Sequence, residues 1–408
     1  MTTAVGLLIV AFSGLLMGSG AWPFKLMRKY QFEHWWLLGM LVGLIILPWT
    51  ITLSFCPRPI ESIGNIPVSA ILIGNVFSVG WGIANVLCGI CFVRIGVALT
   101  GAILAGLGVS VGALVPMVFK GSGLFSGAPS LDSPAGLTVV LGVAIILVGV
   151  VLASLAGFGR DRILKKQDPT SGGFLGGLIM TVIAGILSSF MAFVFVYSQG
   201  PIVANLSHVQ PGSCIDVTID GKADKYAVGE DGMIELTGIG QIAVGQMSAQ
   251  KAADTIEAAY ASGPQPRDVA ITVATGSVAA NVAVYALALL GGAFVNLGYA
   301  LWLMNKNNSW GVLFSSPKEA VLAVIIGVQF CVSVSLTGTG MLLLGTLGAS
   351  VGWGIQQAMQ MTGSQGLGFI SGEWRGVHGR PRMQMYAAIA ILVVASAIMA
   401  YGNTLAKS

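Results

Sequence analysis

The chain has 408 residues, of which 55% are hydrophobic and only 9% are charged, and its formal net charge is +4. Soluble domains usually carry about 25% charged residues, so this composition excludes a chain whose whole surface faces water. Most of the sequence must therefore face lipid, and its 57 glycines suit closely packed membrane helices.

Ten apolar segments follow one another along the chain, each with the roughly 20 residues that a membrane-spanning helix needs. Segments 1 to 10 occupy residues 3–22, 35–55, 68–91, 94–119, 135–158, 173–199, 279–304, 319–345, 348–371 and 383–403. Segments 8 and 9 meet at a short turn near residues 345–348, so their boundary is the least defined. The first segment has no basic residues before its apolar stretch, and we interpret it as a retained membrane helix and not a cleaved signal peptide.

Basic residues are concentrated in the loops that follow the odd-numbered segments. These are Lys25, Arg28, Lys29, Arg94, Arg160, Arg162, Lys165, Lys166, Lys306, Lys318, Arg375, Arg380 and Arg382, whereas the short loops of the other side carry only Arg58 and Lys120. Cytoplasmic loops are enriched in lysine and arginine, so the odd-numbered loops are predicted to be cytoplasmic. We therefore expect a multi-pass protein of the bacterial inner membrane, with both termini and the loop between segments 6 and 7 outside the cytoplasm.

None of the sixteen acidic residues lies in the middle of a predicted span. Glu33, Glu61, Glu319 and Glu373 lie at or near helix ends, and nine others fall between residues 216 and 268. A charge at the centre of the bilayer is costly and usually functional, so the pathway through this protein is predicted to be lined by neutral polar groups. This pattern argues against a carrier of charged substrates and against a channel with an acidic ring.

Segment 3 also contains a C-x-x-C pair, Cys88 and Cys91. Such a pair can hold a metal or carry redox chemistry, but no second pair and no histidine lies near it. We interpret both cysteines as packing residues and expect no metal site.

Two helical faces combine tryptophan with carboxamides. Ser78, Trp81 and Asn85 in segment 3 are spaced three and four residues apart and share one face. Segment 9 repeats this arrangement. An indole can cover the C–H side of a sugar ring while amides bond its hydroxyls; alternatively, these groups only bond neighbouring helices. The candidate substrate-binding residues are Ser78, Trp81, Asn85, Tyr197, Gln199, Asn296, Gln329, Trp353, Gln356 and Gln357.

Residues 205–276 have a different pattern from the flanking parts, 1–204 and 277–408, which hold the apolar segments. "CIDVTIDG" alternates apolar and polar residues and ends in an Asp-Gly turn, and "KYAVGEDGMIELTGIGQIAV" adds two or three short strands. Ser248 is a predicted N-cap for a helix, and "RDVAITVAT" predicts a closing strand. We expect a compact α+β domain. Its four basic and nine acidic residues suit neither nucleic acid nor an anionic membrane, and it shows no catalytic constellation, so no enzyme is predicted.

Three stretches outside this domain resemble one family of transporters. They are "PFKLMRKYQFEHWWLLGMLVGLIILPWTI" (23–51), "GWGIANVLCGICFVRIGVALTGAI" (80–103) and "GEWRGVHGRP" (372–381). They resemble the L-rhamnose–proton symporter family of the drug/metabolite transporter superfamily. The resemblance implies ten helices in two inverted five-helix repeats, outward-facing termini, and import of a neutral sugar such as L-rhamnose by alternating access.

The resemblance also implies proton coupling, for which this sequence offers few groups. The family has a histidine near the position of Gln356 or Gln357, and His34, His208 and His378 all lie outside the predicted spans. Coupling needs a titratable group, and Glu33 at the start of segment 2 is the candidate; its alternative interpretation is a helix-end charge that reaches the membrane surface. Facilitated diffusion and sodium coupling stay open, and no other cofactor is expected.

The inserted domain resembles the soluble-ligand-binding β-grasp domain of polysaccharide export proteins, in which "PG" opens a strand and "DG-x-I" precedes "G-x-I-x-V". Three roles follow from this resemblance. The domain could capture sugar or close the outer mouth as a lid, it could dock a cell-envelope saccharide partner or a second copy of the chain, or it could move as a rigid plug. A different function for the whole protein is that of an envelope component that senses polysaccharide through this domain without transporting it.

Overall fold

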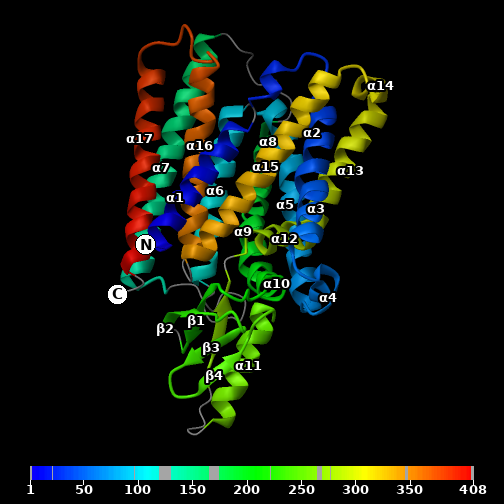
Figure 1. The fold of residues 1–408 in the computed structure, drawn as a ribbon. Helices are drawn as coiled ribbons and strands as arrows, with labels where there is room; N and C mark the ends of the chain where they lie inside the picture. Colours follow the sequence, from blue (N-terminus) through cyan, green and yellow to red (C-terminus); the bar gives the residue numbers. More distant parts are fainter. Residues whose placement is uncertain are drawn as a thin grey trace. The chain divides into compact units, whose positions relative to one another are not determined.

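The computed structural model describes residues 2–20, 22–95, 97–118, 130–164, 174–220, 222–263, 269–275, 277–344 and 348–405 (Figure 1). The basic residues Lys120, Lys165 and Lys166, most of the predicted turn near 345–348, and the first two residues of "RDVAITVAT" lie outside these ranges. The chain divides into two compact units. Unit 1 comprises Met1–Leu47, Gly74–Val196 and Leu289–Ser408, and unit 2 comprises Pro48–Ile73 and Tyr197–Ala288.

Each of the ten predicted apolar segments is helical over most of its described residues. Segments 1, 3, 4, 5, 8 and 10 each correspond to one helix: α1 (Thr2–Ser19), α5 (Val68–Arg94), α6 (Val97–Val118), α7 (Pro134–Ile163), α15 (Pro317–Leu344) and α17 (Arg380–Leu405). Segments 2, 6, 7 and 9 are each divided into consecutive helices. They are α2 (Phe32–Met40), η2 (Leu41–Ile46) and α3 (Leu47–Phe55) in segment 2; α8 (Phe174–Ser188), α9 (Phe190–Val194) and η3 (Phe195–Gln199), continued by α10 (Gly200–Leu206), in segment 6; α12 (Val278–Ala288) and α13 (Leu290–Lys306) in segment 7; and η5 (Gly348–Gly352) and α16 (Trp353–Ile370) in segment 9. Short helices η1 (Phe24–Leu26), α4 (Pro59–Gly64) and α14 (Trp310–Leu313) lie in loops.

Seven of these helical stretches are long and apolar enough to cross a membrane, and the broken pair α12 and α13 makes an eighth if it is one span. The shorter apolar helix Ile103–Val118 is part of α6, and α16 has four glutamines among its eighteen residues. The described residues therefore form a polytopic helical membrane protein with seven or eight candidate spans. The predicted number of ten stays a prediction.

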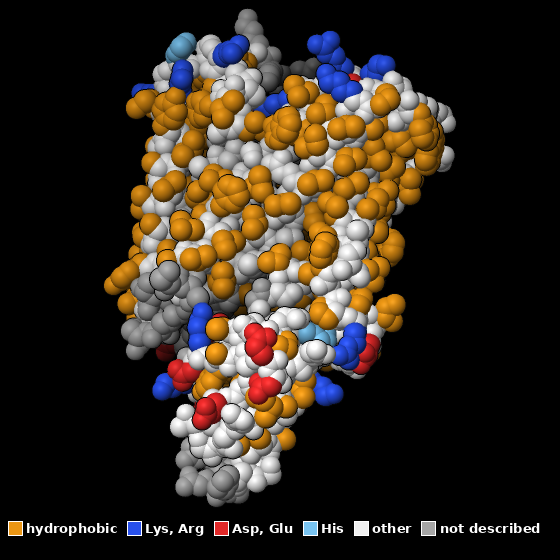
Figure 2. Space-filling model, in the orientation of Figure 1, with side chains coloured by type: hydrophobic (Ala, Val, Ile, Leu, Met, Phe, Trp, Pro, Cys, Tyr) orange, Lys and Arg blue, Asp and Glu red, His pale blue; other side chains and the backbone are white. Residues whose placement is uncertain are grey.

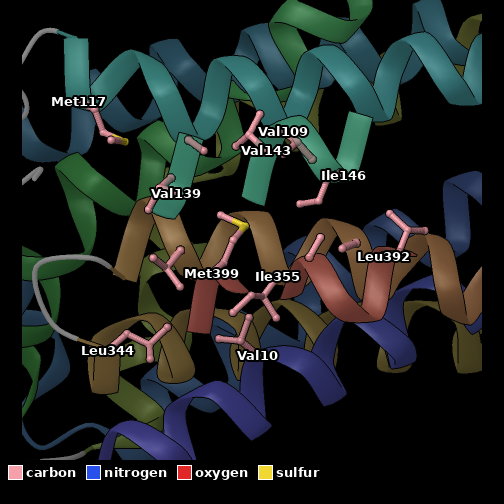
Figure 3. Close-up of a cluster of buried hydrophobic side chains, with 14 of the residues drawn as sticks. Val10, Val109, Met117, Val139, Val143, Ile146, Leu344, Ile355, Leu392 and Met399 are labelled. Atoms are coloured by element: carbon pink, nitrogen blue, oxygen red, sulfur yellow. The ribbon is translucent and has the colours of Figure 1, made fainter. Parts of the chain in front are cut away.

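The core of unit 1 is a cluster of buried aliphatic side chains from several distant helices. Figure 3 shows Val10 of α1, Val109 of α6, Ile146 of α7 and Ile355 of α16 pointing into the same space. Helices α7 and α17 run side by side and add Val139, Val143, Leu392 and Met399 to this cluster (Figures 1 and 3). Burial of these side chains fixes α16, which carries the candidates Trp353, Gln356 and Gln357.

Glycines allow α1 to approach α16 closely. A methyl group added at Gly18 would overlap the carbonyl oxygen of Gln360, and one at Gly14 would overlap that of Gln356. In a membrane, where lipid tails are as apolar as leucine, such close backbone packing supplies much of the attraction between helices. The Gly14-x-x-x-Gly18 spacing is therefore a packing surface between α1 and α16.

The outer faces of the unit 1 helices are apolar. Leu8, Leu175 and Phe294 are 70%, 68% and 64% exposed, and hydrophobic side chains cover these helices in Figure 2. Basic side chains gather near one end of the same helices. A contiguous apolar surface of this kind suits lipid and not water, which agrees with the membrane assignment.

Unit 2 contains the predicted α+β domain. Its strands are β1 (Cys214–Ile219), β2 (Lys222–Ala227), β3 (Met233–Leu236), β4 (Gly240–Ala243) and β5 (Ile271–Ala274), and its helix is α11 (Ala249–Ser262). An antiparallel sheet has the order β2-β1-β5, with Val217 opposite Asp224 and Val273, and β3 pairs with β4 in a second sheet. The alternation of strands, one helix and a closing strand is confirmed.

The domain has a hydrophobic core of its own. Ile215 and Val217 of β1, Ile234 and Leu236 of β3 and Ile256 of α11 are each 1% exposed or less. The Ser248 side chain accepts the Lys251 N–H at 3.2 Å, as predicted for the N-cap of α11. Compact unit 2 extends beyond the predicted domain 205–276, since it also contains α4, α10 and α12.

Candidate functional site

The polar face of α5 caps the first turn of α13. The Gly291 N–H donates to Asn75 Oδ1 at 2.8 Å, and the Gly292 N–H donates to Ser78 Oγ at 3.0 Å. The first N–H groups of a helix have no partner within that helix, so α5 supplies them. A Cβ at Gly292 would lie 3.0 Å from the Trp81 ring and 2.5 Å from the Ser78 carbonyl oxygen, so glycine is needed for this approach. Ser78 is therefore used between helices, as the alternative interpretation proposed.

Two further candidates bond neighbouring helices in unit 1. Asn296 is fully buried; its Oδ1 accepts the Trp36 indole N–H at 3.2 Å, and its amide donates to a carbonyl one turn earlier on α13 at 2.7 Å. Gln329 accepts the Trp22 indole N–H at 3.0 Å and donates to a backbone carbonyl of α1 at 2.8 Å. These contacts use much of the hydrogen-bonding capacity of both carboxamides.

Two candidates belong to unit 2. Gln199 is 5% exposed, and its amide donates to Asn281 Oδ1 at 2.7 Å. Tyr197 lies half-buried in the same π-helical turn, η3. The carboxamide pair fastens η3 to α12 within this unit.

Trp81 keeps an aromatic partner and nearby polar groups. Its ring stacks on Phe330 of α15 with centroids 6.2 Å apart and an angle of 25° between the rings. Asn85, one turn along α5, is half-buried and has no hydrogen bond within the described part of the chain. The hydroxyl of Ser333, one turn beyond Phe330, is buried and has no partner there either. An aromatic pair beside unused polar groups is a surface that a sugar ring could contact.

The α16 face is only partly used by the protein. The Trp353 indole N–H donates to the Gly108 carbonyl of α6 at 3.1 Å. Gln356 is 3% exposed and donates to Gln360 Oε1 at 3.1 Å, but its own Oε1 is buried without a hydrogen bond. Gln357 is half-buried and also has none among the residues described. A buried acceptor left without a donor costs about 1–3 kcal/mol, and a donor supplied by a ligand would remove this cost.

The candidate set therefore divides into two groups. Ser78, Gln199, Asn296, Gln329 and Trp353 are bonded to neighbouring helices, whereas four others keep unused hydrogen-bonding or aromatic surface: Trp81, Asn85, Gln356 and Gln357. The remaining candidate, Tyr197, lies half-buried in η3. The two tryptophans pack on different helices, Trp81 against α13 and α15 and Trp353 against α6. The structure brings neither ring into contact with the other.

Glu33 is buried at the start of α2. Its carboxylate is 3% exposed and accepts hydrogen bonds from Asn307 Nδ2 at 3.0 Å and Ser309 Oγ at 3.1 Å. Burial and two neutral donors hold the Glu33 carboxylate in place, and its interpretation as a helix-end charge stays an alternative to a coupling role. These donors belong to the loop that follows α13.

Helix α2 begins three residues earlier than the predicted span, at Phe32. The reason is a capping box: the Gln31 N–H donates to His34 Nδ1 at 3.1 Å. Because Nδ1 accepts, Nε2 carries the proton and donates to the Ser309 carbonyl at 2.9 Å. His34, placed outside the predicted span, therefore lies fully buried in the first turn of candidate span Phe32–Phe55.

Glu319 makes the converse contact at the start of α15. It is 6% exposed and accepts backbone N–H groups from Arg28 at 3.1 Å, Lys29 at 3.0 Å and Tyr30 at 2.7 Å. The loop after α1 thus donates to Glu319 at the start of α15, and the loop after α13 donates to Glu33 at the start of α2. We call this pair of contacts, Glu33 with Asn307 and Ser309 and Glu319 with residues 28–30, the double clasp.

Glu373 joins residues of three predicted loops at the basic end of unit 1, and one of these loops also contributes to the double clasp. It forms ion pairs with Lys25 and, at 3.1 Å, with Arg160, whose guanidinium also lies 5.5 Å from the Trp374 ring centroid. These residues come from the loops after segments 1, 5 and 9. The double clasp adds the loop after segment 7, so four of the five loops predicted to be cytoplasmic meet at one end.

Sequence reasoning missed several partners in these contacts. Phe330 lies in an apolar run, and no spacing signal separates it from lipid-facing residues. Asn307 and Ser309 follow α13 in the turn sequence "NKNNS", a polar stretch that could have indicated a helix end with side chains free to bind an anion.

Comparison with known proteins gives one family match. The model of the family described as "L-rhamnose-proton symport protein (RhaT)" matches residues 5–208. The L-rhamnose-proton symporters of Yersinia pestis bv. Antiqua (strain Antiqua) and Yersinia pseudotuberculosis serotype O:3 (strain YPIII) are both 31% identical over 171 residues, which is 42% of this chain and 48% of each relative. The chain spans about half the length of the curated relatives it matches. The matched range includes Glu33 and Trp81 and ends just before β1.

Proposed function

The chain belongs to the L-rhamnose-proton symport protein family, and from this premise we propose that it imports a neutral sugar such as L-rhamnose, coupled to protons, across a bacterial inner membrane. A family of transporters agrees with the prediction that the chain is not an enzyme. The relatives match less than half of this chain. The proposal assigns to the whole chain the activity for which these relatives are named.

The proposed architecture is ten membrane helices in two inverted five-helix halves. All ten apolar segments are helical, which supports this architecture. Seven helical stretches qualify as spans by length and hydropathy, and α6, the α12–α13 pair and α16 would bring the number to ten. The basic end of unit 1, where four loops meet, is proposed to face the cytoplasm. The termini and the α+β domain then lie outside the cytoplasm.

The proposed substrate site uses Trp81, Asn85, Gln356 and Gln357, with Trp353 as the aromatic residue of α16. The observation that carries it is the buried Gln356 Oε1, which has no hydrogen bond in the described part of the protein. A sugar hydroxyl is a donor that would satisfy this atom, and each carboxamide can both donate to and accept from a hydroxyl. The Trp81–Phe330 pair supplies an apolar surface for the ring carbons.

Exchange of Gln356 for methionine separates a binding role from a structural one. Met has a similar shape and no unsatisfied oxygen, so Gln356→Met should leave the fold as stable or more stable. If the oxygen binds substrate, uptake of labelled L-rhamnose into proteoliposomes should fall at least tenfold. Gln365→Met, further along the same helix, is the matched control and should retain uptake; normal uptake by Gln356→Met would place the site elsewhere.

We propose that Glu33 carries the coupling proton. It is the acidic side chain that opens candidate span Phe32–Phe55, and its partners Asn307 and Ser309 are neutral donors, so protonation would weaken both bonds. Glu33→Gln should keep exchange of sugar between the two sides but lose accumulation driven by a pH gradient. Accumulation driven by a sodium gradient instead would favour sodium coupling, and exchange without any accumulation in the wild type would favour facilitated diffusion.

The α+β domain, which we propose to be a β-grasp domain, would capture sugar or close the outer mouth. The separate hydrophobic core of this domain supports the competing function, polysaccharide sensing without transport. A self-contained domain could bind envelope polysaccharide, an envelope partner or a second copy of the chain. Deletion of residues 205–276 with a short linker decides between them. A folded, deleted protein that still transports sugar excludes polysaccharide sensing as the main function.

A further inference from the structure

A cavity in unit 2 has no role in the function described so far. Its volume is about 220 Å³, and its lining residues are Pro57, Arg58, His208, Gln210 and Gln246. The first two belong to the loop that follows α3. The others belong to the α+β domain, His208 and Gln210 before β1 and Gln246 between β4 and α11, so one compact unit contains the whole cavity. With about 30 Å³ for each water molecule, this volume corresponds to about seven waters, which is space for a single sugar ring.

The lining groups provide both donors and acceptors. The side chains of Gln210 and Gln246 can each donate and accept, and Arg58 presents planar donors. Arg58 lies 3.9 Å from Glu61, and both side chains are more than half exposed, so this weak ion pair leaves guanidinium donors for a ligand. Carboxamides and one guanidinium match a cluster of hydroxyl groups.

His208 contributes an unused polar atom. Its Nδ1 is buried and makes no hydrogen bond in the part of the chain described. The His208 backbone is held by an isolated bridge to Ser248, the N-cap of α11, so the ring is placed by the folded domain. A ligand in the cavity would lie against the His208 ring and change its surroundings.

The backbone at the cavity is strained on two sides. Arg58 has a φ of 42° and Gln246 a φ of 60°, both in the left-handed region that side chains with a Cβ rarely adopt. Such strain persists only where the surrounding structure imposes it, and it is concentrated at functional sites. Of the four non-glycine residues with positive φ in the described ranges, these two line the same cavity.

We propose that this cavity is a second saccharide site, which binds a single neutral sugar before it enters the membrane part. The proposal rests on the proposed sugar transport and assigns sugar capture to the residues named above. Its occupant is the transported sugar, whose hydroxyls bond Gln210, Gln246 and Arg58 and which lies against the His208 ring.

The test follows His208 in the full-length protein. The three histidines are labelled with ¹³C and ¹⁵N in purified protein in nanodiscs, and the His208 signal is assigned by its loss in His208→Asn. L-rhamnose should shift this signal in a saturable manner. Gln210→Ala and Gln246→Gly should each raise the apparent Kd about tenfold, the effect of one lost hydrogen bond. Glycine relieves the strained φ at position 246, so that variant should fold.

Two controls make the result decisive. Gln241→Ala, an exposed carboxamide of β4, should leave the titration unchanged. The titration is repeated in Gln356→Met: a His208 shift that persists supports a separate site, and one that disappears overturns the proposal. A shift with a hexuronate or inorganic phosphate but not with L-rhamnose also overturns it, because the cavity then binds anions.

Capture and transport can fail separately. If proteoliposomes take up L-rhamnose while His208 does not respond at saturating sugar, the capture site is wrong and the transport function stands. If His208 binds the sugar and no uptake occurs, the transport function is wrong and the saccharide site stands.

Discussion

The Ser309 hydroxyl donates to the Glu33 carboxylate at 3.1 Å, across 276 residues of sequence. It joins the first turn of α2 to the loop after α13, while the Glu319 carboxylate joins the first turn of α15 to residues 28–30. Two buried carboxylates therefore hold two loops at the basic end of unit 1. In a transporter that works by alternating access, this end can open only if these contacts break or move together.

Asn307→Ala removes one of the two side-chain donors to Glu33. A hydrogen bond to a buried charged group contributes about 1.5–3 kcal/mol, so the free energy of unfolding should fall by that order. Thermal unfolding of the purified protein measures this change. Asn305→Ala, an exposed asparagine on the last turn of α13, is the matched control and should change little; equal losses in both variants would contradict the clasp.

Glu319→Gln should release the loop of residues 28–30. A carboxamide has one acceptor oxygen where the carboxylate has two, and it lacks the charge that strengthens these bonds. Arg28 and Lys29 are trypsin sites, so trypsin should cleave there faster in membrane vesicles that expose this end. Glu61→Gln is the control, because its ion pair with Arg58 is exposed and worth little. Unchanged cleavage in Glu319→Gln would show that other contacts hold the loop.

The apolar segments and the α+β alternation could be predicted because hydrophobic period and turn residues are local signals. The start of α2 could not be placed as well, since it depends on the bond between the Gln31 N–H and the His34 side chain. From the sequence alone, the aromatic-acidic stretch before residue 35 is predicted to be a loop. Because α2 begins at Phe32, Glu33 and His34 lie in its first turn, in buried positions that composition alone does not indicate.

The candidate site was predicted as helical faces, and α5 and α16 are helical at these positions, but spacing does not give the neighbours of each face. Spacing places Ser78 and Trp81 on one side of α5, yet it cannot show that Ser78 meets the Gly292 N–H or that Trp81 meets Phe330. The same limit applies to Arg58 and His208, which lie 150 residues apart and line one cavity. Such pairs depend on tertiary packing.

Gly18→Ala should weaken the contact between α1 and α16. The added methyl group overlaps the Gln360 carbonyl oxygen, which belongs to the backbone and cannot rotate away. Overpacking of this kind typically costs about 1–3 kcal/mol. Gly298→Ala on α13 is the matched control: nothing lies within 4 Å of its new Cβ, and alanine should stabilise that helix by about 0.5–1 kcal/mol. Thermal unfolding in detergent should separate the two variants, and a neutral Gly18→Ala would contradict the close packing.

The stability of unit 2 should depend on the charge of His208. Burial lowers the pKa of this histidine from its ordinary value, and Arg58 lowers it further, while the Leu206 carbonyl and Glu61 oppose the shift. A histidine whose pKa is lower in the folded than in the unfolded state binds protons preferentially when unfolded, so stability falls as the pH falls from about 7.5 through its unfolded pKa near 6.5. We expect His208→Asn to flatten the change in melting temperature between pH 7.5 and 5.5. Titration of the ¹³C-labelled His208 signal provides the direct check, and a pKa at or above 6.5 would contradict the burial of this ring.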